Sequence, residues 1–323
     1  MAQIAVNKVI PAMQRSEWCD IAAIASRSLD KAREAADKLE IAKAYGSYEE
    51  LLDDSEIEAI YIALPNHLHV AWAIRCAEAG KHVLCEKPIG LTVKEAQRLL
   101  EARDRTGVRI EEAFMVRHHP QWKGVLEIIE SGGIGQVRSV MGVFSYNNRD
   151  PQNIRNIFEY GGGGLMDIGC YLIYAARLVF AGEPQKVIGL VEEDPVSRTD
   201  VLTSSLLQFA SGQAVFTCST KLGSYQRLQI AGTEGRIEIE IPFNAPPDQP
   251  CRVWLRDASN PPAIQTLEYG PCDQYTAQGD AFSRSVRERG AAAVPLEGSI
   301  RNMAVIEAIL RSAKTGAWEI PQE

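Results

Sequence analysis

The stretch His82-Val83-Leu84-Cys85-Glu86-Lys87-Pro88 joins a short apolar run to a charged pair and a proline. Gly80 precedes the run and Pro88 follows it, so residues 83–85 are predicted to form a buried strand of a parallel sheet. In open α/β sheets, ligands bind beyond the carboxyl ends of the strands. Lys87 is therefore a candidate for an acid or base in a crevice, because burial readily shifts the pKa of a lysine. On this stretch alone, a solvated charge pair at a strand end is the favoured interpretation.

Strand and helix patterns alternate through the first part of the chain. Buried strands are predicted at residues 20–25, 59–64 and 108–114, and helices at residues 4–13, 28–39, 67–79 and 92–106. Ser28 is a predicted N-cap, and Thr92 with Glu95 forms a capping box. Gly80 and Gly107 stand where helix C-termini commonly take a glycine. This alternation predicts βαβ units and a parallel sheet.

The pattern changes near residue 120. After a helix at residues 121–130 and a strand at residues 137–146, a helix is predicted at residues 166–180. Strands then follow one another at residues 186–191, 203–209, 214–220, 227–231, 236–241 and 252–255, and two helices at residues 275–289 and 299–314 complete the pattern. Ser211-Gly212 reads as a hairpin turn. We therefore predict an α/β fold with two domains, 1–119 with a parallel sheet and 120–323 with a large, mostly antiparallel sheet.

Composition excludes several classes of protein. The net charge of −8 and the lack of a basic run argue against a nucleic-acid surface. No signal peptide and no membrane-spanning apolar run is recognised. The seven cysteines include no C-x-x-C pair, which predicts free thiols in a reducing compartment, the cytoplasm, and no structural zinc site. The His67/His69 and His118/His119 spacings do not match a helical zinc site, so no metal is predicted.

Polar residues follow three neighbouring predicted strands, at Pro65-Asn66, at Glu86-Lys87 and at Arg117. A fourth feature is the glycine run 161–164, which precedes Asp167 and Tyr171. The i, i+4 spacing places these two residues on one helix face, where a carboxylate and a phenol can hold a substrate hydroxyl and move its proton. Considered on its own, this pair could equally be structural, with Asp167 as a helix cap and Tyr171 as a half-buried tyrosine that packs on the sheet.

Taken together, these motifs resemble the glucose–fructose oxidoreductase / inositol dehydrogenase family across nearly the whole chain. The resemblance rests on Pro65-Asn66 with His69, on residues 80–83 leading to Glu86-Lys87-Pro88, on residues 112–115 with Arg117 and Pro120, and on the glycine run with Asp167 and Tyr171. It implies a Rossmann domain at 1–119, a substrate-binding and oligomerisation domain at 120–323, and a homo-oligomer, a dimer or tetramer. It also implies that Lys87, Asp167 and Tyr171 are the catalytic residues.

In carrying a tyrosine at position 171, the chain resembles one branch of that family. This branch includes glucose–fructose oxidoreductase, NADP-dependent D-xylose dehydrogenase and dimeric dihydrodiol dehydrogenase. Residues 144–146, 149–151 and 153–156 resemble the same branch and are expected to form part of the substrate pocket. The expected cofactor-binding residues are Ser26, Arg27, Leu64, Pro65, Asn66, His69, Glu86, Lys87 and Arg117. The expected substrate-binding residues are Arg149, Asn153, Arg155, Asp167 and Tyr171.

The strand predicted at residues 20–25 runs into Ser26-Arg27-Ser28. At this position NAD enzymes usually carry an acidic residue for the ribose 2′-hydroxyl. An arginine can instead pair with a 2′-phosphate, so NADP is predicted in preference to NAD. The competing interpretation of Arg27 is a solvent-facing residue at a helix start. The predicted activity is hydride transfer between NADP and a hydroxyl-bearing carbon of a small sugar, polyol or cyclic diol.

One departure from the family concerns the first residues. Relatives begin with an apolar strand and a glycine-rich turn, whereas this chain begins Met1-Ala2-Gln3-Ile4-Ala5. We therefore expect that roughly ten residues of strand and turn should precede this start in a working enzyme, since the turn cradles the pyrophosphate. The alternative is a non-catalytic binding or regulatory protein on the same fold.

Overall fold

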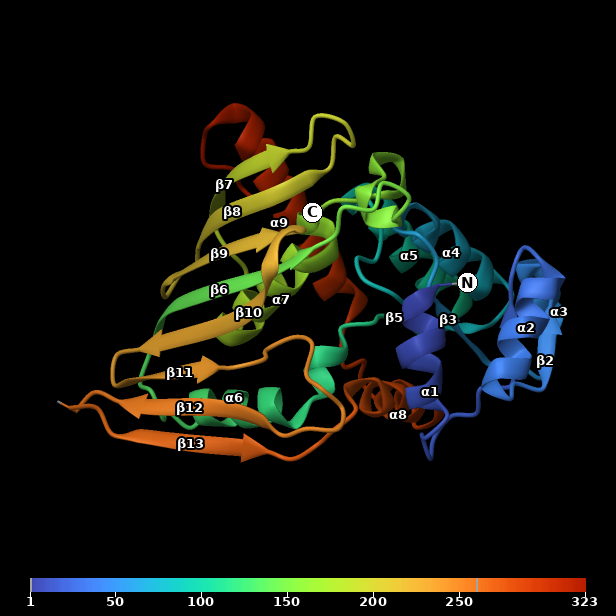
Figure 1. The fold of residues 1–323 in the computed structure, drawn as a ribbon, viewed down its shortest axis with the longest axis horizontal. Coiled ribbons are helices and arrows are strands. Elements are labelled where there is room, and N and C mark those ends of the chain that lie inside the picture. Colours follow the sequence, from blue (N-terminus) through green and yellow to red (C-terminus); the bar gives the residue numbers. More distant parts are fainter. Residues whose placement is uncertain (1, 260) are drawn as a thin grey trace.

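The structure is a computed structural model that describes residues 2–259 and 261–323 (Figure 1). Met1 of the quoted N-terminal stretch lies outside the described residues. The first part of the chain carries short parallel strands and most of the surrounding helices, and the second part is dominated by one large sheet (Figure 1).

The first part follows the predicted alternation of helices and strands. Its elements are η1 (Ala5–Val9), α1 (Ile10–Met13), β1 (Ala23–Ala25), α2 (Leu29–Leu39), β2 (Lys43–Tyr45), α3 (Tyr48–Asp53), β3 (Ala59–Ile62), η2 (Asn66–Leu68), α4 (His69–Glu78), β4 (His82–Cys85), α5 (Val93–Thr106) and β5 (Ile110–Glu112). The Ser28 and Thr92 hydroxyls accept the backbone N–H groups of Lys31 and Glu95, which confirms both predicted caps. The sequence did not predict β2 and α3.

The parallel strands form two separate sheets, with strand orders β1-β2 and β3-β4-β5. We expected the strands at residues 20–25 and 59–64 to be buried on both faces. That expectation was wrong, because Ile24 is the only buried residue of β1 and Ile62 the only buried residue of β3. Each of these two strands has one hydrogen-bonded strand neighbour among the described residues, which leaves its other edge uncovered by a strand.

The second part contains the large sheet and the helices that cover it. Its elements are η3 (Met115–His118), α6 (Pro120–Glu130), β6 (Val137–Asn147), η4 (Ile154–Asn156), η5 (Phe158–Tyr160), η6 (Leu165–Gly169), α7 (Cys170–Phe180), β7 (Lys186–Glu193), β8 (Asp200–Gln208), β9 (Gln213–Ser219), β10 (Lys221–Gly232), β11 (Gly235–Ile239), β12 (Cys251–Asp257), β13 (Ile264–Tyr269), α8 (Gln274–Arg287) and α9 (Leu296–Thr315). The sequence did not predict β13.

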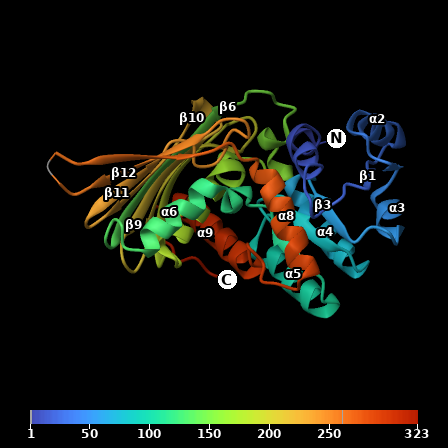
Figure 2. The ribbon, with the colours of Figure 1, turned by 90° about the horizontal axis from the view of Figure 1, so that it is seen from below.

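The large sheet has the order β13-β12-β11-β10-β6-β9-β8-β7 and is antiparallel except where β6 pairs with β9. This confirms the predicted mostly antiparallel sheet. Helices α6, α7 and α9 cover one face of it (Figure 2). The other face exposes apolar side chains, with Met141 and Val215 each 43% exposed and Tyr225 51% exposed.

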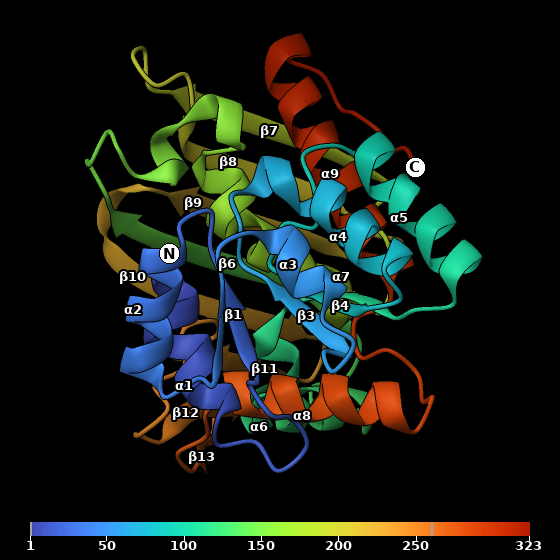
Figure 3. The same cartoon turned by 90° about the vertical axis from the view of Figure 1, so that its right-hand side faces the viewer.

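Helix α8 returns from the second part to the first, where it packs against α1 (Figure 3), and it also packs against η3. The Thr276 hydroxyl donates to the Ala12 carbonyl at 2.7 Å, and Phe282 lies in a small core with Leu84 and Ala113. A division of the chain into domains at residue 119 therefore stays a prediction, because α8 belongs to the second part in sequence but packs against the first.

Residues Phe158–Phe180 are long and apolar enough to span a membrane by length and composition alone, but 78% of that apolar window is buried inside the fold.

Candidate functional site

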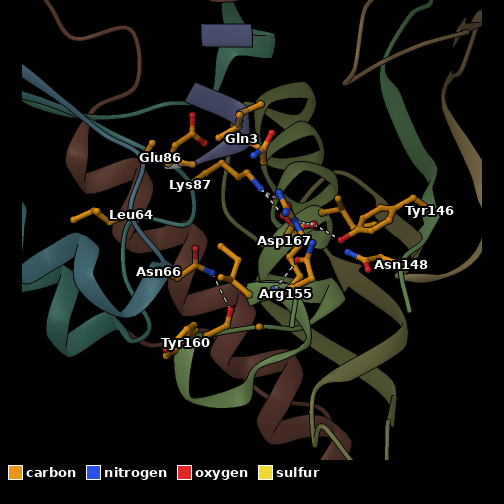
Figure 4. Close-up of a pocket in the computed structure, with 18 of the residues that line it drawn as sticks. Gln3, Leu64, Asn66, Glu86, Lys87, Tyr146, Asn148, Arg155, Tyr160 and Asp167 are labelled. Carbon is orange, nitrogen blue, oxygen red and sulfur yellow. Dashed lines mark hydrogen bonds and ion pairs between the residues drawn. The ribbon is translucent and has the colours of Figure 1, made fainter. Parts of the chain in front are cut away.

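A cavity of about 680 Å³ lies where the carboxyl ends of β3 and β4 face the start of η6 and the end of β6 (Figure 4). Strands β3 and β4 are neighbours and parallel, so the residues that follow them reach the same edge of the sheet. Both parts of the chain therefore contribute side chains to a single concave site.

The Asp167 carboxylate is the centre of the polar groups in this cavity. The Lys87 ammonium donates to Asp167 Oδ1 at 3.0 Å and to the Asp167 carbonyl at 2.5 Å. On the other carboxylate oxygen, Oδ2, the Tyr146 hydroxyl donates at 2.5 Å and Arg155 Nε at 2.8 Å. Burial alone would raise the pKa of Asp167, but Lys87, Arg155 and Tyr146 together hold it well below its ordinary value. Asp167 is therefore an anion at neutral pH.

Lys87 is held in its charged form by the same contact. Burial alone would lower the pKa of Lys87, but the Asp167 carboxylate together with the nearby Cys170 and Glu86 groups outweighs burial, and the pKa lies above its ordinary value. An ammonium has three N–H donors, and two of them are accounted for by Asp167. Among the described residues, the third N–H has no acceptor, so it can donate to a ligand oxygen in the cavity.

His69 joins the ends of β3 and β4 from the start of α4. Its ring is fully buried, with Nδ1 2.7 Å from the Pro88 carbonyl oxygen and Nε2 2.7 Å from the Leu64 carbonyl oxygen. Burial lowers the pKa of His69, and these two backbone contacts only partly offset that effect. The ring thus links the backbone that follows β3 to the backbone that follows β4, and it also lines the cavity.

Two buried carboxyl groups, those of Glu86 and Glu112, lie near Lys87. Glu86 Oε1 accepts the Tyr61 hydroxyl at 2.6 Å, and burial raises the pKa of Glu86. Glu112 Oε1 accepts the Ile89 backbone N–H at 2.8 Å, and burial raises the pKa of Glu112 to about 7. Within the described residues, Glu112 Oε2 has no partner. Glu112 therefore supports the segment immediately after Lys87 without reaching the cavity.

Tyr171 lies beneath Lys87, with the ammonium 5.0 Å from the centre of its ring. Its hydroxyl donates to the Met115 sulfur at 3.3 Å, and its ring packs edge-on against Phe114. Burial raises the pKa of Tyr171 well above its ordinary value, so the phenol stays protonated. The hydroxyl thus faces a weak acceptor, which a better acceptor on a ligand can replace.

The structure brings most of the expected site residues into one cavity. Those that line it are Leu64, Asn66, His69, Glu86, Lys87, Asn153, Arg155, Asp167 and Tyr171. Those outside its lining are Ser26, Arg27, Pro65, Arg117 and Arg149, whose assignments stay predictions. Tyr146 was expected only as part of the 144–146 segment. Its contact with Asp167 could not be foreseen, because the two residues meet only through the pairing of distant elements.

Arg27 directly follows β1 and precedes the N-cap Ser28. Its side chain is exposed, and the hydrogen bonds and ion pairs among the described residues do not include it. The beginning of the N-terminal helix also faces the cavity, which Ala2, Gln3 and Lys8 help to line. Within residues 2–259 and 261–323, no three His, Cys, Asp or Glu side chains are grouped so as to hold a metal ion.

Comparison with known proteins gives matches to both parts of the chain. Residues 2–114 match an oxidoreductase family with an NAD-binding Rossmann fold, and residues 122–238 match the GFO/IDH/MocA C-terminal domain. An uncharacterized oxidoreductase of Rhizobium meliloti is 50% identical over 321 residues, which cover 98% of this chain and 96% of that protein. A D-xylose 1-dehydrogenase (NADP(+)) of Haloferax volcanii is 38% identical over 320 residues, with the same coverage of 98% and 96%.

A solved structure with the same fold is a 3-ketoreductase from Actinomadura kijaniata in complex with NADP and TDP-benzene. It matches with a TM-score of 0.89 at 28% sequence identity, and the match covers 96% of this chain and 95% of that chain.

Proposed function

Because this chain belongs to the GFO/IDH/MocA oxidoreductase family, we propose that it is an NADP-dependent enzyme that transfers hydride to or from a hydroxyl-bearing carbon of a sugar, polyol or cyclic diol. The observation that carries the proposal is the Lys87 ammonium, which Asp167 holds at the wall of the cavity and which has one N–H without an acceptor among the described residues. The Haloferax relative is named a D-xylose 1-dehydrogenase (NADP(+)), which supports this class of substrate and cofactor.

Lys87, Asp167 and Tyr171 are the proposed catalytic residues. NADP would supply the hydride chemistry. Lys87 gives a proton to the substrate oxygen in the reducing direction. In the oxidising direction it must first lose a proton to solvent, and the neutral amine then receives the proton of the substrate hydroxyl. Lys87 and Arg155 both pair with Asp167, so two cationic groups lie close to the proposed position of the substrate oxygen and favour negative charge developing there. Tyr171 supplies a second hydroxyl beneath Lys87, from which it can bind the same oxygen in place of the Met115 contact.

The residues present fit NADP. Leu64, Asn66 and Glu86 line the cavity along the ends of β3 and β4, where the nicotinamide half would bind. Lys8 and the start of the N-terminal helix offer a cation and backbone N–H groups to phosphate oxygens. Arg27 is exposed without a protein partner among the described residues, as a residue that pairs with a 2′-phosphate would be.

We also propose the finer features that the fold supports. The exposed apolar face of the large sheet suits self-association into a dimer or tetramer. The seven free cysteines suit a reducing compartment, the cytoplasm. The alternative of a non-catalytic protein gains no support from the site, because Lys87 and Asp167 are both in place.

The test has a binding arm and a turnover arm. NADPH is titrated into the protein while nicotinamide fluorescence is recorded, with NADH as the comparison. A panel of free sugars, polyols and cyclic diols, D-xylose included, is then assayed with NADP by the absorbance of the reduced nicotinamide. Saturable NADPH binding together with turnover of at least one member supports the proposal. Binding of neither cofactor, with no turnover, would contradict it.

A further inference from the structure

The Asp167 carboxylate divides its two oxygens between two kinds of partner (Figure 4). Oδ1 accepts the Lys87 ammonium, whereas Oδ2 accepts the Tyr146 hydroxyl and Arg155 Nε. Lys87 comes from the end of β4, Tyr146 from the end of β6 and Arg155 from η4. Tyr146 and Arg155 therefore bind the same carboxylate as Lys87, on its other oxygen.

Tyr146 can offer only an acceptor to a ligand. Burial raises the pKa of Tyr146 well above its ordinary value, and the Asp167 charge raises it further, so the group stays a phenol. Its single proton is committed to Asp167 Oδ2, but a hydroxyl oxygen keeps lone pairs for another hydrogen bond. Tyr146 lines the cavity. A hydroxyl that approaches from the cavity can thus donate to it.

Arg155 complements this acceptor with donors. Its Nε is bound to Asp167, whereas its two terminal nitrogens have no hydrogen-bond acceptor among the described residues. A guanidinium has five N–H donors in a fixed plane. A ligand hydroxyl between Tyr146 and Arg155 can therefore donate to the phenol oxygen and accept from the guanidinium, which satisfies both roles of a hydroxyl group.

We infer that Tyr146 is a specificity-determining residue. It accepts a hydrogen bond from the substrate hydroxyl on the carbon next to the reacting carbon and, through Asp167, positions Lys87. The inference rests on the proposed function, in which Lys87 binds the oxygen on the reacting carbon. The two oxygens of one carboxylate hold both binding groups, so the two ligand oxygens must be close together. Adjacent hydroxyls on a ring meet this requirement, since each hydrogen bond adds only about 2.7–3.0 Å. The preferred substrates are neutral compounds with two adjacent hydroxyl groups.

The test compares a ring with two adjacent hydroxyls and the same ring with one. Cyclohexane-1,2-diol and cyclohexanol are assayed with NADP, and kcat and KM are determined separately for each. A site that hydrogen-bonds a substrate hydroxyl rejects the analogue that lacks it, because its polar groups are then left unpaired. The wild-type protein is expected to prefer the diol by at least about 100-fold in kcat/KM, a threshold set well below the roughly 10⁴- to 10⁵-fold that such sites can reach.

The variant is Tyr146→Phe, and the matched control is Tyr45→Phe. Tyr45 also donates its hydroxyl to a carboxylate, Asp54 Oδ2 at 2.6 Å, but outside the cavity. Tyr146→Phe should lower kcat/KM for the diol by about 10- to 100-fold, the effect of one lost hydrogen bond of this kind, and reduce the diol preference accordingly. NADPH affinity should stay within about threefold, and the control should keep the wild-type preference.

The outcomes separate this inference from the proposed function. Equal turnover of the diol and the mono-alcohol by the wild-type protein, or an unchanged preference in Tyr146→Phe, would overturn the inference and leave NADP-dependent hydride transfer standing. Failure to bind NADPH or to turn over any substrate would overturn both. Should Tyr146→Phe not fold by its melting temperature, Arg155→Lys replaces it, since lysine keeps the charge near Asp167 but loses the planar donors. The expected result is again a reduced diol preference.

Discussion

Two regions differ in how far protein contacts already satisfy their polar groups. One is the cavity around Asp167, called the substrate side, and the other is the segment after β1 at Arg27, called the ribose side because we propose that it binds the 2′-phosphate. On the substrate side, Asp167 is bound by Lys87, Tyr146 and Arg155 and is buried with them. On the ribose side, Arg27 is exposed and has no partner among the described residues. The substrate side is therefore organised by the protein itself, and we propose that the ribose side is organised when a ligand supplies an anion.

This difference has a physical reason. A charge that must act on a reacting bond needs a fixed position, which burial and several hydrogen bonds provide. An arginine that pairs with a cofactor phosphate forms strong, often bidentate hydrogen bonds, and it can form them only if protein groups have not already taken its donors. Changes on the substrate side should therefore affect turnover, and changes on the ribose side should affect cofactor choice.

The largest expected effect is that of Lys87→Met. Turnover should fall about 10²- to 10⁴-fold, the usual contribution of a general acid or base, while NADPH binding changes little. The matched control is Lys81→Met at the other end of the same strand, where the buried Lys81 donates to the Asp54 carbonyl at 2.7 Å. Near-normal turnover by Lys87→Met, measured by the reduced-nicotinamide absorbance, would remove Lys87 from the reaction.

A second effect concerns stability on the substrate side. Glu112 has a pKa of about 7 in the folded chain against an ordinary value of 4.5. Between these values the folded state keeps a proton that the unfolded state has lost, so stability falls as the pH rises through this window, by up to about 3 kcal/mol. Glu112→Gln, which keeps an acceptor for the Ile89 N–H, should remove this part of the decline.

Guanidinium chloride unfolding at pH 5 and pH 8 measures the effect. The wild-type protein should lose more stability than Glu112→Gln between the two conditions. Glu86 also has a raised pKa and contributes to the same decline in both proteins, so the difference between the two declines isolates Glu112. Parallel declines would show that Glu112 ionises in the folded chain as readily as in the unfolded one.

The smallest expected effect lies on the ribose side. Arg27→Asp should weaken NADPH binding about 10- to 100-fold, as expected for a lost charge-assisted hydrogen bond, and should leave NADH binding equal or better. Arg33→Asp makes the same charge change at an exposed position of α2 and should leave the preference unchanged. If both variants behave as wild type in fluorescence titrations with the two cofactors, Arg27 is only a surface residue.

The sequence predicted the elements whose signals are local. The Ser28 and Thr92 caps and the β4 strand end at Lys87 are examples, since each depends on a few adjacent residues. It missed β2 and β13, because β2 is only three residues long and β13 is mostly exposed, so neither shows a buried apolar run.

In the candidate site, too, the sequence predicted what local motifs encode and missed what depends on tertiary packing. Lys87 and Asp167 could be named from motifs, and the structure brings them into contact. The hydrogen bond from Tyr146 to Asp167 depends on how β6 lies beside η6, which no local pattern encodes. Likewise, Tyr171 was expected as a catalytic residue with Lys87 and Asp167, but the contact of its hydroxyl with the Met115 sulfur arises only from the packing of η3 near α7.

The central claim is that this cavity moves a hydride between a hydroxyl-bearing carbon and NADP with Lys87 as the proton-transferring group. The direct measurement follows deuterium from a substrate labelled at its reacting carbon, such as D-xylose deuterated at the anomeric carbon, or the most active member of the panel labelled likewise. We expect the label to appear on the nicotinamide ring of NADPH formed by the wild-type protein, and its transfer to fall at least about 100-fold in Lys87→Met. Bound NADP that never acquires the label from any substrate in the panel, or equal transfer by Lys87→Met, would contradict the claim.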